Sequence, residues 1–262
     1  MNQNLTLQVK VFGHLMHREM IALSKVITDF VINAAITSPL FLFVFAKIIM
    51  IMGTSASHIP IIIAGEISVQ ALFLGWGEAS ALVTDLNNRC ECQYLSRIPI
   101  SPRLAFLKYT CASIVKSFIV GTVVLVATKI ALWDVFCLAQ FSIPKFFLAM
   151  ILNSTFYGIV ATTIAARSKN LDQVTSMFMR CVFPLWMIIF LGPWHMLATA
   201  SPTLGTIALF SPITYTMEAV RGAILGQEGF INFWTCIGVG TTATIFLGIL
   251  GLHWMKKRLD HI

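Results

Sequence analysis

Long apolar stretches alternate with short polar ones along the chain. Six of the apolar stretches reach the roughly 20 helical residues that are needed to cross a hydrocarbon core. They run approximately over residues 27–52, 59–83, 104–131, 143–166, 173–193 and 230–255. The polar segments between them are too short for a separate soluble domain. The pattern therefore predicts a single all-α transmembrane domain over residues 1–262, with six membrane-spanning helices.

The first 26 residues have a different pattern, with one apolar and one basic face at helical spacing. The apolar positions are Leu5, Val9, Phe12, Met16, Met20 and Leu23, and the opposite face carries Lys10, His14, His17 and Arg18. The segment lacks the short apolar core and small-residue cleavage site of a secretory signal. We therefore expect residues 1–26 to form an amphipathic helix that lies in the membrane surface and leads into the first span.

Lysine and arginine residues flank the predicted spans at alternate ends. They precede the first span, lie in or beside the loop after the second, and follow the fourth and the sixth. The opposite loops, 53–58 and 132–142, contain no Lys or Arg. Because positive residues favour the cytoplasmic side, both termini are expected in the cytoplasm.

Composition supports a membrane protein and argues against several other classes. The chain is 57% hydrophobic and 11% charged, with a mean hydropathy of +0.83, whereas soluble domains carry about a quarter charged residues. The net charge of +7 resides in the span flanks and forms no basic stripe with interleaved aromatics, so we expect no nucleic-acid partner. Cys90 and Cys92 have no further ligands at metal-site spacing, so no metal site is expected.

The cytoplasmic loop over residues 84–109 predicts a short amphipathic helix at about 86–98. Asn87 and Asn88 suit a helix N-terminus, and the proline that follows the segment ends it. A plain connector rarely presents an apolar edge beside charged residues. We therefore expect a docking surface for a cytoplasmic partner, formed by Glu91, Tyr94, Leu95, Ile98 and Pro99.

The segment after the fifth span stays apolar but is broken by prolines and glycines. Broken backbone is tolerated at membrane depth only where protein or a water-filled cavity satisfies it. The segment therefore predicts a re-entrant helical hairpin at about 194–226, made of two short helices that enter the membrane and return.

The second half of this segment predicts a helix over 213–225. Pro212 favours its start and Gly226 its end. On such a helix Tyr215 and Glu218 share a face, and Glu218 and Arg221 are close enough to pair.

Several charged residues lie inside the predicted spans, and five of them are candidate pathway residues: Lys47, Glu66, Glu78, Lys116 and Arg180. Such groups normally find partners or face a cavity. By depth, the first two lie together in the outer half, while Glu78 and Arg180 lie toward the cytoplasm, so pairing is expected for most of them. Lys116, near mid-membrane, has no obvious partner and is the better candidate for a functional charge. Trp76, Trp186 and Trp194 are candidates for lining an apolar route.

Taken together, these segments resemble the permeases of the type-2 ABC exporter family, the polysaccharide, lipid and drug export group. Such permeases have six spans, an amphipathic N-terminal helix and a P-x-x-Y-x-x-E/D-A-x-R segment, matched here by Pro212, Tyr215, Glu218, Ala219 and Arg221. The family's acid, Leu, Pro and small residue in the cytoplasmic loop correspond to Glu91, Leu95, Pro99 and Ser101. Cys92 and Gln93 replace the usual Gly-Thr. ARSKNLDQV at 166–174 resembles the family's turn between spans four and five.

The resemblance implies a permease subunit that moves an amphiphile outward across the bacterial cytoplasmic (inner) membrane. The cargo would be a lipid-linked glycan, a lipid or a hydrophobic drug. Two separate ABC ATPase subunits and a second permease copy would be its partners. ATP and Mg²⁺ would bind to the ATPase, because this chain has no Walker A pattern, and the chain would not itself be an enzyme. Residues 86–98 would be the coupling helix, and 194–226 would close the outer end of the pathway.

Two other classes of protein remain open. An ion-coupled secondary carrier would use Glu66 or Glu78 as its proton site, although it leaves the docking-like loop without a purpose. An intramembrane enzyme would need convergent catalytic side chains at mid-depth. The six histidines lie near the termini or in expected loops, which argues against that class.

Overall fold

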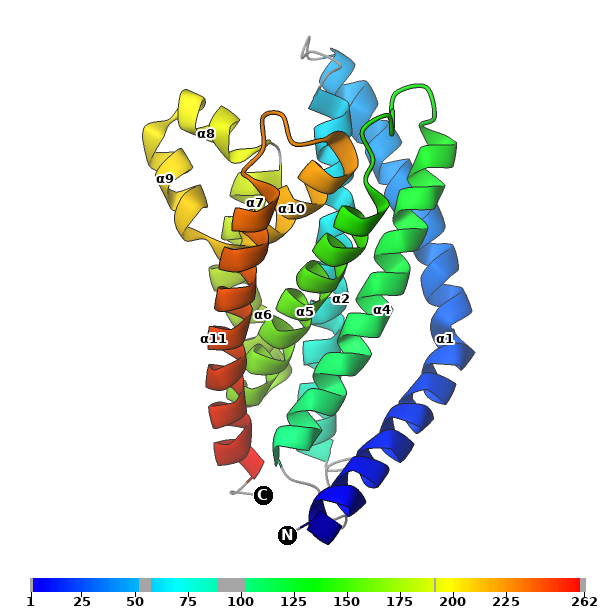
Figure 1. Cartoon of the computed structure of the whole chain (residues 1–262), viewed down its shortest axis with the longest axis vertical. Coiled ribbons are helices and arrows are strands. Elements are labelled where there is room, and N and C mark those ends of the chain that lie inside the picture. The colour runs from blue at the N-terminus through cyan, green and yellow to red at the C-terminus, as the bar shows by residue number, and fades with distance from the viewer. Residues whose placement is uncertain (1, 52–57, 89–101, 191, 260–262) are drawn as a thin grey trace.

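The computed structural model describes residues 2–51, 58–88, 102–190 and 192–259. Every regular element in this part of the chain is a helix (Figure 1). The helices are α1 (Asn2–Ile51), α2 (Ile59–Asn88), α4 (Pro102–Ala131), α5 (Ile143–Arg167), α6 (Leu171–Met177), η2 (Phe178–Val182), α7 (Phe183–Phe190), α8 (Trp194–Ala200), α9 (Pro202–Phe210), α10 (Pro212–Leu225) and α11 (Phe233–Leu259).

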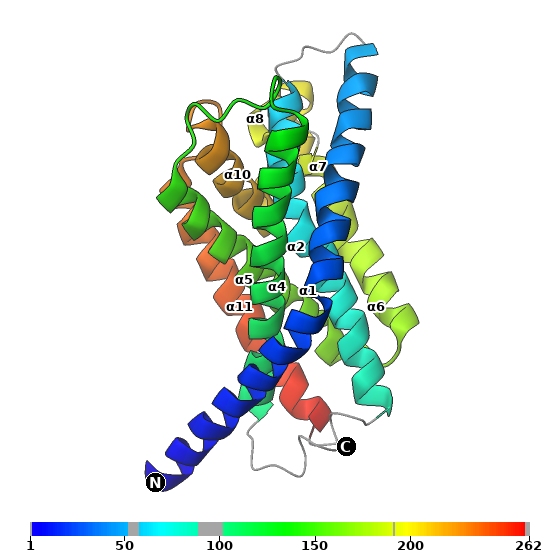
Figure 2. The ribbon, with the colours of Figure 1, turned by 90° about the vertical axis from the view of Figure 1, so that its right-hand side faces the viewer.

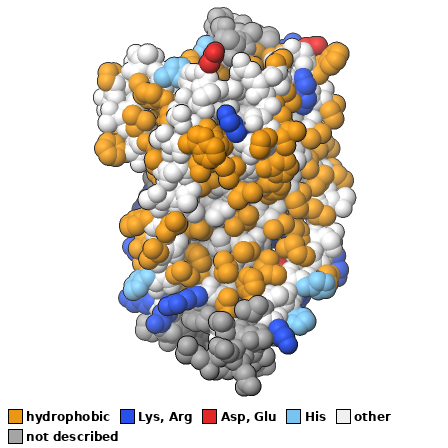
Figure 3. Space-filling view, in the orientation of Figure 1, with side chains coloured by type: hydrophobic (Ala, Val, Ile, Leu, Met, Phe, Trp, Pro, Cys, Tyr) orange, Lys and Arg blue, Asp and Glu red, His pale blue; other side chains and the backbone are white. Residues whose placement is uncertain are grey.

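Six helical segments are long and apolar enough to cross a membrane, as the sequence predicts. Five of them lie in α1, α2, α4, α5 and α11, and the sixth, Leu171–Phe190, is assembled from α6, η2 and α7. Hydrophobic side chains cover much of the middle of the face in Figure 3. These features indicate a multi-pass membrane protein.

The predicted surface helix over 1–26 and the predicted span over 27–52 form one continuous helix, α1. Residues 14–38 contain neither Gly nor Pro, and therefore nothing in the sequence ends the helix there. The N-terminal part of α1 leans away from the bundle in Figure 2. Glu19 of α1 pairs with the buried Lys108 of α4 at 3.0 Å.

The centre of the bundle is the contact between α2 and α5, the two most buried spans. Ser68 Oγ donates to Asn153 Oδ1 at 2.7 Å, and Asn153 Nδ2 donates to the Ser68 carbonyl at 3.1 Å. Gly75 of α2 faces α5 so closely that a Cβ there would lie 3.2 Å from the carbonyl oxygen of Tyr157. Small residues and interhelical hydrogen bonds are the usual means by which helices associate in lipid. α4 and α11 then pack on either side of α5 (Figure 1).

α1 begins and α11 ends at the same end of the bundle (Figure 1). There Arg258 of α11 donates to the carbonyl of Ala165 at 2.6 Å and to that of Ser168, which satisfies two carbonyls at the end of α5. In the following turn, Asn170 accepts from the Gln173 N–H, and Gln173 accepts from the Lys169 N–H. This end of α11 therefore holds the turn between the fourth and fifth spans.

Three short helices, rather than the two expected, connect the fifth and sixth spans. α8 and α9 pack against each other at one side of the bundle (Figure 1). α10 begins at Pro212 and ends before Gly226, whose φ is +94°, so this helix matches its predicted bounds closely. It is buried against α11, α5 and α2.

The close approach of α2 and α5 predicts different effects for two neighbouring glycines. Gly75→Leu should lower the free energy of unfolding by about 1–3 kcal/mol, because the new side chain meets backbone. Gly77→Leu is the matched control in the same helix, since a Cβ at Gly77 has nothing within 4 Å. Thermal unfolding of the detergent-solubilised variants measures both effects. Equal losses would show that the α2–α5 contact is looser than described.

Candidate functional site

Arg221 is fully buried and joins two other helix ends to α10. Its Nη2 donates to the Phe190 carbonyl at 2.7 Å, and its Nη1 donates to the Gly192 carbonyl at 3.2 Å, at the end of α7. Its Nε donates to the Ile61 carbonyl at 3.3 Å, in the first turn of α2. A Cβ at Gly65 would lie 2.9 Å from Nη2, so the glycine leaves room for the guanidinium. One side chain thus fastens the second and fifth spans to α10.

Glu218, one turn earlier on α10, is also fully buried and completes the arrangement. Its Oε1 lies 3.6 Å from Arg221 Nη1, so the predicted pair is present. The two carboxylate oxygens accept from the N–H of Trp194 at 3.3 Å and of Ile231 at 3.2 Å. Burial raises the pKa of the carboxyl above its ordinary value, and Arg221 and the two N–H donors oppose that shift. We call Glu218 and Arg221 the α10 bracket.

The other residues of the predicted gate occupy the first part of α10. Pro212 is the first residue of the helix, where its missing N–H costs no hydrogen bond. The half-buried Tyr215 donates its hydroxyl to the Leu209 carbonyl at 2.9 Å and so ties α10 back to α9. The residues of the predicted gate therefore lie on one helix, and Tyr215, Glu218 and Arg221 each bond to backbone outside it.

A separate cavity of about 560 Å³ lies among α1, α2, α4 and α7. Its polar lining comes from α1 and α2: Asn33, Thr37, Ser38, Glu66 and Gln70. Gln70 Nε2 donates to Glu66 Oε1 at 2.6 Å and to Ser38 Oγ at 2.8 Å. We call this cavity the lateral pocket, because some of its rim residues, such as Phe41 and Phe73, are exposed on the side of the bundle.

Aromatic rings form the opposite wall of the lateral pocket. Trp186 of α7 contacts Phe73 edge to face at 5.8 Å between centroids and lies 5.0 Å from Phe183. Trp186 is 7% exposed, yet its indole N–H finds no acceptor in the described part of the chain. A buried unpaired donor is costly. Trp186 therefore contributes its ring to the pocket wall, with a buried indole N–H that could bond to a neighbouring group after a small rearrangement.

The α10 bracket and the lateral pocket share a neighbour in Phe190. The carbonyl of Phe190 accepts from Arg221, and its ring lies 5.0 Å from that of Trp186. Gly65, which admits the guanidinium, is adjacent in sequence to Glu66. The α10 bracket therefore holds the backbone of two helices of the lateral pocket. These are α2, whose Glu66 and Gln70 form what we call the polar corner of the pocket, and α7, which carries Trp186 of its aromatic wall.

The fifth span changes its hydrogen-bond pattern just before the aromatic wall. η2 is a π-helical turn in which the N–H of Phe183 bonds to the carbonyl of Phe178, five residues earlier. Pro184 has no N–H to give to the carbonyl of Arg180, so an ordinary helical ladder cannot continue here. π-turns within α-helices often lie at functional sites and bend the helix.

The remaining intramembrane charges are arranged differently from the prediction. Lys116 was expected to lack a partner, but its Nζ lies 2.7 Å from Glu78 Oε1 across the α2–α4 contact. Glu66 bonds to Gln70, and not to Lys47, which is exposed with its Nζ 5.5 Å from the Phe43 ring centroid. Arg180 is exposed on η2. Of these five charges, only Glu66 lines the lateral pocket.

Some expected site residues cannot be placed. Glu91, Tyr94, Leu95, Ile98 and Pro99 lie outside the described residues, as does most of the predicted coupling helix over 86–98. α2 itself continues to Asn88, so residues 86–88 belong to its last turn. Sequence reasoning missed Ser38 and Gln70 as partners of Glu66. The spacing of four between Glu66 and Gln70 was the available signal.

Removing either member of the α10 bracket should leave buried polar groups without partners. We expect Arg221→Leu to lower the free energy of unfolding by about 3–5 kcal/mol. Arg180→Leu, which removes an exposed arginine, should change it by less than about 0.5 kcal/mol. Thermal and chemical unfolding in detergent give both values.

The pairing itself is tested with Glu218→Leu and with the double variant. The loss in the double variant should fall short of the sum of the single losses by about 1 kcal/mol or more, because the residues are in contact. Strict additivity would mean that the two side chains act independently.

Comparisons of the chain with protein-family models, with curated proteins and with solved structures give no match.

Proposed function

We propose that the chain is the membrane subunit of an ATP-driven exporter that moves an amphiphile outward. The observation that carries this proposal is the folding of the P-x-x-Y-x-x-E-A-x-R segment. It forms one buried helix, α10, whose two charges bind the ends of neighbouring spans beside a mixed polar and aromatic pocket. The resemblance to type-2 ABC exporter permeases supplies the direction of transport and the class of partner.

The lateral pocket suits a molecule with both hydroxyl groups and apolar surface. The carboxylate of Glu66 and the amide of Gln70 accept and donate hydrogen bonds, and Trp186 has an unused donor. Aromatic faces opposite them favour the C–H edges of a ring or chain. Pockets of this kind combine an apolar wall with a few placed polar groups. A lipid-linked glycan, a lipid or a hydroxyl-bearing hydrophobic drug fits this chemistry.

We propose that α2 transmits movement from the docking loop to the lateral pocket, because it is one long, unbroken helix. Its 30 residues extend for about 45 Å. Ile61 at one end is held by Arg221, Glu66 and Gln70 face the pocket, and the proposed docking loop follows Asn88 at the other end. A displacement of that loop by an ATPase would move the pocket's polar corner. The π-turn before Phe183 gives the opposite wall a place to bend.

The proposed assembly contains two ATPase subunits that bind ATP and Mg²⁺, docked on the loop around Glu91 and Leu95, and a second copy of this chain. It resides in a bacterial cytoplasmic membrane. In this proposal the segment 194–226 is re-entrant, closes the outer end of the pathway and has the α10 bracket as its anchor.

A second candidate function is an ion-coupled carrier. The observation that favours it is the buried carboxyl of Glu66, which lines a pocket and has hydrogen-bond partners but no ion-pair partner among the described residues. Such a carboxyl is the kind of group that binds a transported proton.

The first test is purification of the tagged chain in mild detergent, followed by identification of stoichiometric partners. We expect a protein with a phosphate-binding loop, whose ATP hydrolysis changes in rate when it binds this chain. Glu91→Ala combined with Leu95→Ala should reduce that association at least tenfold, while Gln93→Ala in the same loop should not. A homomer without ATPase activity would overturn the exporter proposal and favour the carrier.

Substitutions in the lateral pocket test the proposed substrate site. Glu66→Leu and Gln70→Leu should each lower substrate-stimulated ATP hydrolysis about tenfold or more, because they remove hydrogen bonds to the substrate, the one from Glu66 being charge-assisted. Arg180→Gln is the control for an intramembrane charge outside the pocket. Unchanged stimulation in the two pocket variants would exclude this site.

Glu66→Gln separates the two candidate functions. In an exporter, the amide still bonds to substrate hydroxyls, so most of the transport should remain. In a proton-coupled carrier, the loss of a titratable group abolishes coupling to a pH gradient. Transport into vesicles, with and without an imposed gradient, gives the answer.

A further inference from the structure

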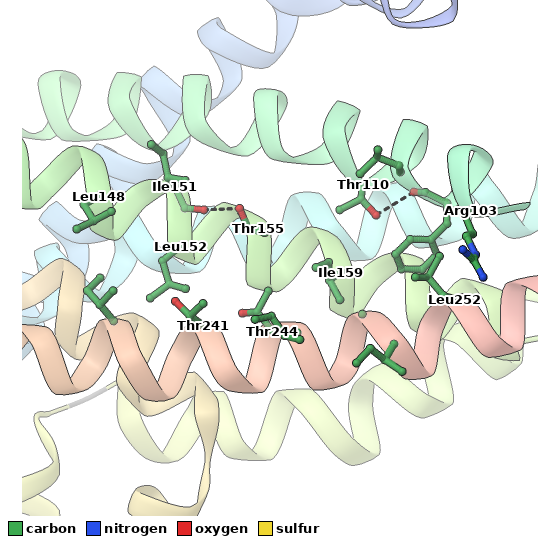
Figure 4. A pocket seen from close by; sticks show the side chains of 16 residues that line it. Arg103, Thr110, Leu148, Ile151, Leu152, Thr155, Ile159, Thr241, Thr244 and Leu252 are labelled. Carbon is green, nitrogen blue, oxygen red and sulfur yellow. Dashed lines mark hydrogen bonds between the residues drawn. The ribbon is translucent and has the colours of Figure 1, made fainter. Parts of the chain in front are cut away.

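A second cavity, unrelated to the lateral pocket, lies on the face formed by α4, α5 and α11. It is a groove of about 640 Å³, and Figure 4 shows the side chains that line it. α5 forms its floor, and α11 runs along one side. Two rim residues on α11, Ile245 and Ile249, are 59% and 64% exposed. The groove therefore opens toward whatever surrounds the bundle.

The groove is apolar although several threonines line it. Thr155 donates its hydroxyl to the Ile151 carbonyl at 2.6 Å, and Thr110 donates to that of Phe106 at 3.0 Å (Figure 4). Thr244 donates to the Gly240 carbonyl at 2.6 Å. Each of these hydroxyls thus has an acceptor within its own helix, and Thr110 also contacts the Thr162 hydroxyl at 3.3 Å, so their hydrogen-bonding needs are met inside the protein. The walls suit an alkyl chain.

The length of the groove matches a membrane lipid. Its lining residues on α11 run from Ile237 to Leu252, a distance of about 22 Å along the helix. The hydrocarbon layer of one leaflet is about 15 Å thick, half of the roughly 30 Å core. One complete acyl chain therefore fits along the groove, with length left over for the start of a headgroup.

Two exposed cations lie at one end of the groove, whereas at the other end Lys145 of α5 is partly buried with its Nζ 5.7 Å from the Phe233 ring centroid. Arg103 and Leu252 are at the end with the exposed cations in Figure 4. Arg103 is exposed, and within the described part of the chain it has no carboxylate in contact. Lys256, also exposed, follows Leu252 by four residues and so lies on the same side of α11, one turn beyond the groove. These two cations are placed where a lipid headgroup meets the water interface.

We propose that this groove is a binding site for a phospholipid with an anionic headgroup. One acyl chain lies along α11 over the floor formed by α5, and Arg103 and Lys256 hold the phosphate and its negative headgroup. Basic pockets between membrane helices favour anionic lipids in this way. The site depends on the six spans lying in a bilayer, and not on the exporter function.

The experiment is native mass spectrometry of the delipidated full chain with added dioleoylphosphatidylglycerol or dioleoylphosphatidylcholine. Wild-type protein should bind the anionic lipid at least about fivefold more tightly, the effect expected for one or more cations near the membrane surface. Arg103→Gln with Lys256→Gln should remove this preference, while Arg180→Gln should keep it. Equal affinities of the wild type for the two lipids would overturn the proposal.

A glycine pair tests whether the acyl chain occupies the groove. Gly248 lines it, and a Cβ there makes only ordinary contact with Ile159 at 3.6 Å, so Gly248→Leu fills space without a clash. This variant should bind both lipids at least fivefold more weakly. Gly238→Leu on the same helix, where a Cβ has nothing within 4 Å, should bind them as the wild type does. Equal binding by the two variants would place the lipid elsewhere and contradict the assignment.

Discussion

The buried guanidinium of Arg221 is the constraint on which the upper half of the bundle in Figure 1 depends. A helix that ends inside a protein leaves carbonyl groups without partners, and Arg221 bonds to one at the last residue of α7, Phe190, and to one just beyond it, at Gly192. Arginine suits this position because its planar group offers several donors and stays charged when buried. Glu218 balances the charge, and its remaining bonds to two backbone N–H groups order the starts of α8 and α11. The bracket thus converts several incomplete helix ends into one connected unit.

The two cavities of the bundle differ in how their polar groups are used. In the groove of α4, α5 and α11, the hydroxyls of Thr155 and Thr244 bond within their own helices, and Arg103 and Lys256 lie at one end. In the lateral pocket, Gln70 bonds to Glu66 in its own helix and to Ser38 of α1, and the buried indole N–H of Trp186 has no acceptor among the described residues. The groove thus offers a hydrocarbon chain mainly apolar contacts. The lateral pocket offers directional contacts, which is what recognition of a passing molecule requires.

Sequence reasoning succeeded where the signal is local. The bounds of α10 follow from Pro212 and Gly226, and the Glu218–Arg221 pair follows from their spacing of three. It failed for Lys116, because apolar pattern and flanking charge give the depth of a residue but not the direction in which its side chain leaves the helix. The contact with Glu78 depends on how α2 and α4 are rotated against each other.

The same limit applies to the bracket and the pocket. No pattern near Arg221 points to Ile61 or Phe190, and no pattern near Glu66 points to Trp186. These partners are set by packing across the bundle. The continuity of α1 across residue 26 has another reason: amphipathic character describes the surroundings of a helix, and a change of surroundings does not by itself end one.

The contact between Arg221 and the Ile61 carbonyl joins residues 160 positions apart, and Arg258 reaches back 93 positions to Ala165. A ribosome makes the acceptors long before the donors. The carbonyls at the end of the fourth span therefore lack the Arg258 donor until the last helix is made, whereas the Ile61 carbonyl bonds within α2 and gains Arg221 as a second donor. The C-terminal residues act last, and the nascent bundle becomes complete only when the final helix has left the ribosome.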